Sequence, residues 1–196
     1  VDIECGSTTN NLERQKQVGF SNTIFVIGTK LLTKKESGIK DFADLAGKNV
    51  VTTAGTTSER LIRKMNEDKK MGMNVISAKD HGEAFLTLET GRATAFMMDD
   101  ALLYGEMAKA KRASDWVVVG TAQSKEAYGC MVRKDDPVFK KVVDTALTKA
   151  MTSGDAEKIY AKWFMNPIPP KGLNLGMPLS DEMKELYKAP NDKAFE

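Results

Sequence analysis

The sequence predicts an α/β fold in which helices cover both faces of a mainly parallel sheet, the arrangement called doubly wound. Two observations carry this prediction. From residue 49 to residue 119, short β-branched segments alternate with segments of helical periodicity. With 41% hydrophobic and 29% charged residues, the 196-residue chain also has the composition of one folded domain or of two small ones.

A long strand precedes this alternation. Residues 21–32 (SNTIFVIGTKLL) are rich in β-branched and aromatic side chains, and the segment is long enough to run between two lobes. Residues 41–45 follow as a short helical turn that ends at Gly47. We expect the alternating part of the chain to begin directly after this turn.

The alternation itself is marked by strands and by helix-capping residues. Strands are predicted at residues 49–54, 74–78, 94–98 and 116–119. Thr56 and Glu59 have the spacing of a capping box, in which the Thr hydroxyl and the Glu carboxylate each bind a free backbone N–H of the first helical turn. Asp80 and Glu83 repeat this spacing before the next helix, which Gly91 ends. Each predicted helix therefore starts shortly after a strand.

Another strand and a long helix follow. The strand is predicted at residues 128–132 (YGCMV). Asp136 and Pro137 are residue types typical of the N-cap and the first position of a helix. The apolar side chains of this helix recur with helical spacing, so we expect one buried face. Its members are Val138, Phe139, Val142, Val143, Ala146, Leu147 and Met151.

Two shorter helices are predicted in the C-terminal part. The first covers residues 159–164, and the prolines that end it are Pro167, Pro169 and Pro170. The second is a short amphipathic helix at residues 180–187, within a tail that is punctuated by Pro and Gly.

The charge balance excludes some classes of function. The 29 basic and 27 acidic residues are spread along the chain and give a formal net charge of +2, without a concentrated basic face. Nucleic acid is therefore not an expected partner. The longest apolar run, residues 23–32, is interrupted by Gly28 and Lys30 and falls short of the roughly 20 residues of a membrane span.

The cysteine and histidine content predicts neither a metal site nor a cofactor. Cys5 and Cys130 lie far apart without C-x-x-C spacing, and His81 is the single histidine. Two interpretations of the cysteines remain open. They are either two buried thiols or a disulfide, formed in an oxidising compartment, that ties the start of the chain to a late strand.

Polar residues at strand ends and helix starts define a candidate ligand site. In sheets of this type, ligands bind beyond the carboxyl ends of the strands, where helix N-termini present free N–H groups. Ser7, Thr9 and Arg14 offer hydroxyl and guanidinium donors that suit a carboxylate. Thr57 offers a further hydroxyl at a helix start, whereas Asp99 has the opposite charge and suits an ammonium group.

Each of these residues also has a purely structural interpretation. Ser and Thr before helices commonly act as caps, and Arg14 alone is typical of a solvated surface charge. Asp99 and Asp100 would serve equally as the N-cap of the following helix. His81 either forms local hydrogen bonds at its helix start or, as an imidazolium, pairs with a second carboxylate. The residues alone thus predict a site for a zwitterionic, anionic ligand.

Five motifs resemble those of the glutamate/aspartate-binding proteins in the type II periplasmic solute-binding family. They occur in the order and at the spacing of that family, and together they cover essentially the whole chain. The motifs are CGSTTNNLERQKQVGFSNTIFVIGTKLLTKK at residues 5–35, TTAGTTSERL at 52–61, ISAKDHGEAFLTLETGRATAFMMDDALL at 76–103, EAYGCMVRKDDPVFKK at 126–141 and KWFMNPIPPKGLNL at 162–175.

The resemblance implies a role for each candidate residue. The α-carboxylate of the ligand would be held by Ser7, Thr9, Arg14 and Thr57. Asp99 would bind the ammonium group. His81 lies at a position that varies with ligand type in the family, and it would contact the side-chain carboxylate and so favour an acidic amino acid.

The resemblance also implies two doubly wound lobes joined by two hinge strands. Residues 1–29 would belong to lobe 1 and the hinge, residues 30–127 would form a complete lobe 2, and residues 128–196 would be the C-terminal part of lobe 1. Family members begin with a signal peptide and a segment that builds most of lobe 1, and this sequence contains neither. We therefore expect an incomplete lobe 1, either because the sequence is a fragment or because another chain completes it, for instance by swapping.

The implied function is binding of L-glutamate or L-aspartate in the Gram-negative periplasm and delivery to the membrane permease of an ABC transporter, without catalysis. The lobes would close around the ligand by hinge motion. Two alternatives remain open. One is a periplasmic dehydratase-like enzyme on the same fold, with His81 as acid/base. The other is the ligand-sensing module of a receptor, which the polar C-terminal end does not suggest.

Overall fold

The computed structural model describes residues 1–169 and 172–195. The chain divides into two compact units. The first unit contains Val1–Ile27 and Lys125–Glu196, and the second contains Gly28–Ser124. Pro170, one of the prolines expected to end a helix, lies outside the described residues.

The sheet of the second unit is mixed, with most strands running in one direction. β2 (Gly19–Lys34) passes from the first unit into the second, where it pairs antiparallel with both β5 (Ala95–Asp99) and β6 (Trp116–Val119). β3 (Asn49–Thr53) pairs parallel with β4 (Asn74–Ala78) and with β5. Because β5 and β6 are both antiparallel to β2, β3 to β6 all point the same way. The expected mainly parallel sheet is confirmed.

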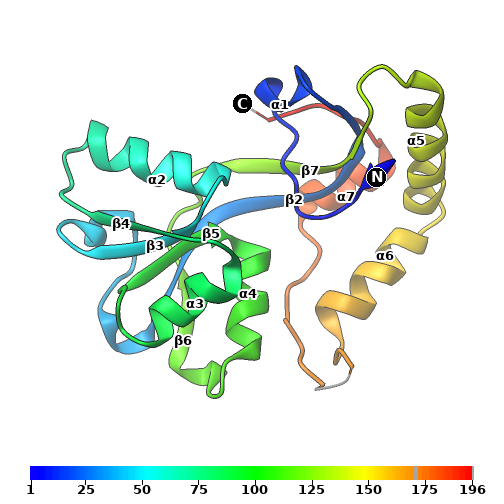
Figure 1. Ribbon diagram of the computed structural model, residues 1–196. Coiled ribbons are helices and arrows are strands. Elements are labelled where there is room, and N and C mark those ends of the chain that lie inside the picture. The colour runs from blue at the N-terminus through cyan, green and yellow to red at the C-terminus, as the bar shows by residue number, and fades with distance from the viewer. Residues whose placement is uncertain (170–171, 196) are drawn as a thin grey trace. The chain divides into compact units, whose positions relative to one another are not determined.

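Helices cover both faces of this sheet (Figure 1). One face carries α2 (Thr57–Asp68) and the 3-10 helix η2 (Phe42–Leu45), and the other carries α3 (His81–Glu89) and α4 (Asp100–Lys109). Two further 3-10 turns are η1 (Lys35–Ser37) and η3 (Ala113–Asp115). The doubly wound arrangement predicted from the alternation is therefore present.

Alternating strand residues build two separate hydrophobic clusters. Leu31 and Leu32 are both fully buried, yet they belong to different clusters, because successive side chains of a strand point to opposite faces. Val50 and Val51 divide in the same way. The cluster under α3 and α4 includes Phe85, Leu88, Phe96, Leu103 and Trp116, and the cluster under α2 includes Ile39, Phe42, Leu45, Ile62 and Met97.

In each of the two predicted capping boxes, one of the two expected hydrogen bonds is present. The Thr56 hydroxyl accepts the N–H of Glu59 at 3.1 Å, and the Asp80 carboxylate accepts the N–H of Glu83 at 2.8 Å, so both N-caps are confirmed. The Glu carboxylates, however, accept the N–H of the residue before each cap, at 2.8 Å in both cases. Each Glu therefore binds a backbone donor one position further from its helix than the motif requires.

The first unit combines a small sheet with helices. β1 (Ile3–Glu4) pairs antiparallel with β7 (Lys125–Val132), which lies next to β2. The helices are α1 (Leu12–Gln15), α5 (Pro137–Thr152), α6 (Asp155–Tyr160), a π-helix (Ala161–Met165) and α7 (Asp181–Lys188). The ring of Phe25 lies 6.2 Å from Tyr128 and 5.7 Å from Tyr160 between centroids, so stacked aromatic rings contribute to the packing of this unit.

The helix starts of this unit partly follow the prediction. Asp136 accepts the N–H of Phe139 at 2.9 Å and Pro137 is the first helical residue, as expected. The next helix begins at Asp155 and not at residue 159, because Gly154 adopts a left-handed conformation (φ +83°) that turns the chain directly into a new helix. None of the helices within residues 1–169 and 172–195 is long and apolar enough to cross a membrane.

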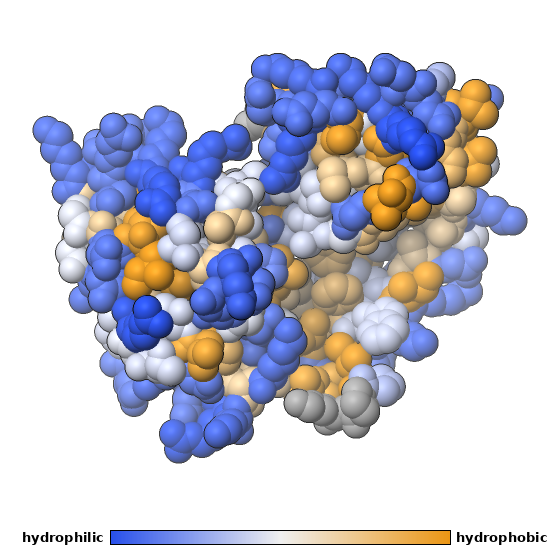
Figure 2. Space-filling model, in the orientation of Figure 1, coloured by the Kyte–Doolittle hydropathy of each residue, from blue (hydrophilic) through white to orange (hydrophobic). Residues whose placement is uncertain are grey.

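The prediction of one buried face on α5 is correct for only some of the residues named for it. Met151 is buried and Phe139 and Leu147 are half-buried, but Val138 and Val142 are 75% and 61% exposed. These two valines lie one turn apart, beside the row that packs inward, and no described residue of the first unit covers them. Figure 2 shows apolar surface over α5. The periodicity indicated an apolar face correctly, but this face is wider than the surface available to bury it.

The two cysteines form a disulfide, which excludes the interpretation as two thiols. Ile3 pairs with Val132 and Glu4 with Met131, so Cys5 and Cys130 are the next directly opposed pair in the same register. Their Cα atoms are 4.2 Å apart. The bond therefore fixes the start of the chain to β7 and closes a loop with a sequence separation of 125 residues.

We predict that replacing both cysteines by serine lowers the free energy of unfolding by about 2–5 kcal/mol, because the unfolded chain regains the freedom of a long loop. Urea unfolding followed by circular dichroism measures this change. Reduction of the unmodified chain should lower the midpoint similarly. An unchanged midpoint and slope in the double variant would contradict the prediction.

Candidate functional site

Three of the candidate residues lie at one edge of the sheet in the second unit. Thr57 is the first residue of α2, which follows β3, and His81 is the first residue of α3, which follows β4. Asp99 is the last residue of β5. Because β3, β4 and β5 are parallel, their carboxyl ends share an edge, and the N-termini of α2, α3 and α4 meet there. This edge combines helix dipoles that favour anions with the buried carboxylate of Asp99.

Asp99 is buried at this edge and occupies the N-cap position of α4, but its side chain does not cap the helix. Its side chain makes no cap hydrogen bond to α4, whereas the Asp100 carboxylate accepts the N–H of Ala101 at 2.8 Å. The structure thus distinguishes the two aspartates that the sequence left equivalent. Asp99 is 2% exposed, and its carboxylate accepts the hydroxyl of the fully buried Ser58 at 3.3 Å.

The pKa of Asp100 differs from that of an exposed carboxyl group. Burial raises the pKa of Asp100, and hydrogen bonds from the backbone of Ala101 and Gly28, together with the charge of Lys30, oppose that rise only in part. The pKa of Asp100 therefore lies above its usual value.

Thr57 is not the N-cap of α2. The N-cap of α2 is Thr56, whose hydroxyl both accepts the Glu59 N–H and donates to the carbonyl of Thr53 at 2.7 Å. Thr57 is 8% exposed and lies in the first turn, where backbone N–H groups point out of the helix end. Its position suits contact with an anion at that end.

His81 is hydrogen-bonded through one ring nitrogen. Its Nδ1 lies 2.8 Å from the hydroxyl of Thr53, the last residue of β3. Burial lowers the pKa of His81, the negative charges of Glu106 and Asp80 raise it, and the Lys109 ammonium lowers it, with a net decrease from the ordinary value. The ring is therefore mainly neutral at neutral pH.

In the first unit, a change of register exposes Ser7. Up to Cys5 the chain follows the β1–β7 register, in which Ile3 pairs with Val132. After it, Thr9 pairs with Tyr128, a register shifted by two residues, so that the segment around Ser7 bulges from the ladder. Ser7 is exposed there, whereas Thr9 is 6% exposed.

Arg14 and Thr9 are brought together by the short helix α1. The Asn11 side chain caps this helix by accepting the N–H of Arg14 at 2.8 Å. The half-buried Arg14 side chain then folds back and donates to the carbonyl of Thr9 at 3.0 Å. The hydroxyl of Thr9 donates to the buried Glu126 carboxylate, a contact that the sequence did not predict.

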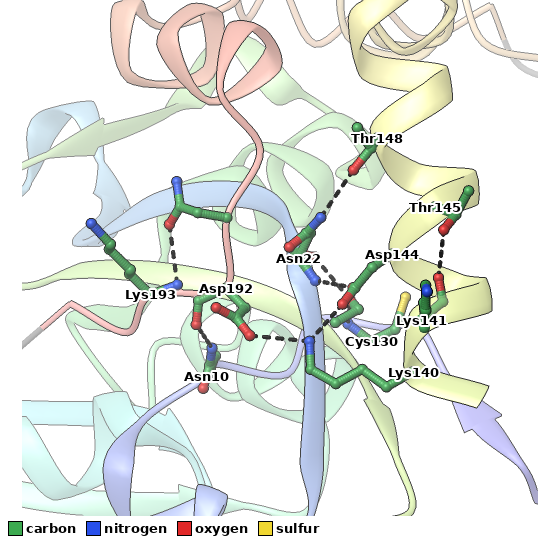
Figure 3. A network of polar contacts seen from close by, with 12 residues as sticks. Asn10, Asn22, Cys130, Lys140, Lys141, Asp144, Thr145, Thr148, Asp192 and Lys193 are labelled. Carbon is green, nitrogen blue, oxygen red and sulfur yellow. Dashed lines mark hydrogen bonds and ion pairs between the residues drawn. The ribbon is translucent and has the colours of Figure 1, made fainter. Parts of the chain in front are cut away.

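The residue after Thr9 anchors this segment to the rest of the first unit. Asn10 is 1% exposed; its amide donates to the carbonyl of Asp192 at 2.9 Å, and its oxygen accepts from Gln15 at 2.8 Å. Figure 3 shows Asn10 and Asp192 side by side at the edge of a polar network. The C-terminal tail thus holds the Thr9 segment in place.

The same network joins the tail to α5. Lys140 lies 2.6 Å from Asp144 and 3.0 Å from Asp192, and Asp144 accepts the backbone N–H of Asn22 in β2 at 2.6 Å (Figure 3). Burial lowers the pKa of Lys140, but hydrogen bonds to the two aspartates outweigh it, so the net pKa is raised. The ion pairs therefore fix three segments of the unit together.

Sequence reasoning missed three polar residues that contact the candidates: Thr53, Ser58 and Glu126. Thr53 and Ser58 adjoin the predicted strand end and helix start around Thr57, and that position is the signal that could have identified them. Glu126 gave no such signal, because its partner Thr9 is 117 positions away.

The chain belongs to the bacterial extracellular solute-binding proteins, family 3, whose pattern matches residues 1–166. It is 71% identical over 196 residues to the L-glutamate/L-aspartate-binding protein of Pseudomonas aeruginosa, covering 100% of this chain and 65% of that protein. It is 68% identical over 194 residues to the glutamate/aspartate import solute-binding protein of Salmonella typhimurium, covering 99% and 64%. The chain thus spans slightly less than two thirds of these curated relatives, and the resemblance drawn from the motifs is confirmed.

Solved structures confirm the fold. An ancestral arginine-binding protein bound to arginine has a TM-score of 0.76 and 34% identity, covering 84% of this chain and 72% of the other. The GluR0 ligand-binding core from Nostoc punctiforme, in complex with L-glutamate, has a TM-score of 0.73 and 27% identity, covering 84% and 73%. The fold is that of the type II periplasmic binding proteins.

We predict that protonation of His81 destabilises the fold. Because burial holds the folded pKa below the unfolded value of about 6.5, the unfolded chain binds this proton more readily, and stability is lost as pH falls below about 6.5. Urea unfolding at pH 7.5 and 5.5 should show a larger loss for the unmodified chain than for His81→Gln. Equal losses in both would contradict the assignment.

Proposed function

We propose that this chain binds L-glutamate or L-aspartate and, as part of a solute-binding protein, delivers it to the membrane permease of an ABC transporter in the Gram-negative periplasm. The observation that carries this proposal is the buried Asp99 among helix N-termini in the second unit. A buried carboxylate in an anion-favouring environment suits a ligand that carries both an ammonium group and carboxylates.

Each charged group of such a ligand has a proposed partner. Asp99 binds the ammonium group. The α-carboxylate is held by Arg14, Ser7 and Thr9 from the first unit and by Thr57 from the second. His81 contacts the side-chain carboxylate and thereby selects acidic amino acids. Arg14 supports this assignment because its guanidinium donates to the Thr9 carbonyl at 3.0 Å and carries further N–H donors.

We propose that Thr9 acts through its backbone N–H. Its hydroxyl has a single proton, and that proton is donated to Glu126. The neighbouring ladder bonds use the Asn10 N–H and the Thr8 carbonyl towards β7. The N–H of Thr9 therefore points to the opposite side of the segment, where a carboxylate could accept it.

The proposal includes two lobes that close by hinge motion. Residues 30–127 act as lobe 2, and residues 1–29 and 128–196 act as an incomplete lobe 1. The chain passes between its units twice, at residues 27–28 and 124–125, which supports the two hinge strands. The two lobes close when the ligand binds, because only the closed form lets the ligand contact both lobes.

Exchange of lobe 1 segments between two copies of the chain is a further part of the proposal. The exposed Val138 and Val142 of α5 support it, since an apolar row of this kind is stabilised by a covering partner. Light scattering over a range of concentrations tests it: a dimer would support exchange, and a monomer throughout would exclude it.

A binding role is favoured over catalysis. In the dehydratase-like alternative His81 is the acid/base, but its Nδ1 is bound to the neutral Thr53 hydroxyl and not to an orienting carboxylate. A turnover assay with small carboxylic acids separates the two roles. The alternative of a receptor's sensing module is less favoured, because the curated relatives at 71% and 68% identity are solute-binding proteins.

The ligand class is tested by isothermal titration calorimetry with L-glutamate, L-aspartate, L-glutamine and L-lysine. The measurement uses this chain and a version extended to the length of the curated relatives. Saturable binding of the acidic pair alone is the expected result. Preference for L-lysine, or no binding to either protein, would overturn the proposal.

We predict that Arg14→Ala weakens L-glutamate binding by about 1.5–3 kcal/mol, or roughly 10-fold to 150-fold, because a carboxylate loses a charged hydrogen-bond donor. The matched control is Arg133→Ala in the same unit, where the arginine side chain is 62% exposed and pairs with Asp2 on the surface. The control should bind as the unmodified chain does. An equal effect of both substitutions would exclude a specific role for Arg14.

A further inference from the structure

A buried glutamate on α4, the helix that packs against α3, has no part in the proposed ligand contacts. Glu106 lies on α4, its side chain is 12% exposed, and it pairs with Lys109 at 2.7 Å. The Lys109 side chain is 61% exposed, so this partner remains hydrated. Carboxylates are seldom buried to this extent without a specific reason. The position of Glu106 therefore indicates a role beyond a surface ion pair.

α4, which carries Glu106, packs against α3, which begins at His81. Phe85 and Leu88 of α3 share a hydrophobic cluster with Leu103 of α4, which holds the two helices together. Among the acidic groups that favour the charged form of His81, Glu106 has a larger effect than Asp80. Asp80 is also occupied as the N-cap of α3.

Thr53 holds the other side of the ring. Its hydroxyl lies 2.8 Å from Nδ1 of His81, and the residue is 6% exposed at the end of β3. A hydroxyl group both donates and accepts hydrogen bonds. It can donate to Nδ1 of the neutral Nε2–H tautomer and accept from Nδ1–H of an imidazolium. With that tautomer, the contact survives protonation of the ring, and Nε2 carries a proton in both states.

We propose that Thr53 and Glu106 are positioning residues that make His81 a proton-linked sensor of the second carboxylate of the ligand. When an acidic side chain docks at Nε2–H, the neutral ring takes up one proton from solvent, and the Thr53 hydroxyl changes from donor to acceptor. The product is an imidazolium paired with the ligand carboxylate. This inference rests on the proposed function and specifies how that site distinguishes acidic from amide side chains.

The sign of the pH dependence follows. Without ligand, burial holds the His81 pKa low, whereas a carboxylate at hydrogen-bond distance favours the charged ring and raises the pKa. Proton uptake then occurs between the two pKa values. Affinity for L-glutamate should rise as pH falls from about 8 to about 6, by up to about tenfold for each unit by which the ligand raises the pKa. L-Glutamine, which brings no second charge, should show no such rise.

The test uses nuclear magnetic resonance, because His81 is the single histidine among the 196 residues and its ring signals need no assignment. Nitrogen-15 shifts of the ring report the tautomer and the pKa, with and without L-glutamate. We expect the Nε2–H tautomer in the free chain and a higher pKa in the complex. The Nδ1–H tautomer in the free chain, or an unchanged pKa in a complex that calorimetry shows to be saturated, would overturn the inference.

Variants separate the two positioning residues. Thr53→Val should lose the tautomer preference, and Thr53→Ser should keep it, which also controls for misfolding of the Val variant. Glu106→Gln should lower the His81 pKa, because a nearby negative charge is removed. Glu89→Gln, an exposed glutamate on α3, is the matched control and should leave the pKa unchanged. Equal pKa values in both Gln variants would exclude Glu106.

The outcomes distinguish this inference from the proposed function. If L-glutamate gives neither heat of binding nor any spectral change, the proposed function fails, while the tautomer and Glu106 results in the free chain still decide the positioning roles. If L-glutamate binds but the His81 ring does not respond, the function stands and only the proton-linked sensor is wrong.

Discussion

Parallel pairing of β3 with β4 and β5 is the constraint on which the second unit depends. Parallel strands require helical crossovers, and the crossovers bring the N-termini of α2, α3 and α4 to a single edge of the sheet. The residues at that edge then divide their tasks. Thr56 and Asp80 cap α2 and α3 through their side chains, and so Thr57 and His81 are not required as caps. Asp99 occupies the N-cap position of α4 without a side-chain cap hydrogen bond. Local helix capping and ligand chemistry are thus carried by adjacent residues.

In the first unit, β7 has the corresponding role. The disulfide from Cys5 to Cys130 fixes one register, and the pairing of Thr9 with Tyr128 fixes another, so that the two anchors hold the segment between them. Asn10 connects this segment to the C-terminal tail, which the ion pairs of Lys140 hold against α5. The short helix that carries Arg14 is therefore held in place by residues that are distant in sequence.

Much of this organisation could be predicted from local patterns. The alternation of residues 49–119, the N-caps Thr56 and Asp80, and the limits of the four strands within this range to one residue followed from spacing, because neighbours in sequence determine them. The contacts of Thr53 with His81 and of Thr9 with Glu126 could not be predicted, since each joins residues distant in sequence. The exposure of Val138 and Val142 was missed because periodicity reveals an apolar face but not the partner that covers it.

The central claim is that the edge formed by α2, α3 and α4 binds an acidic amino acid in one orientation. A crystal structure with bound L-glutamate tests this claim most directly. The account predicts the ammonium group within hydrogen-bond distance of the Asp99 carboxylate and the side-chain carboxylate at Nε2 of His81. A ligand bound with these groups reversed, or bound away from this edge, would contradict it.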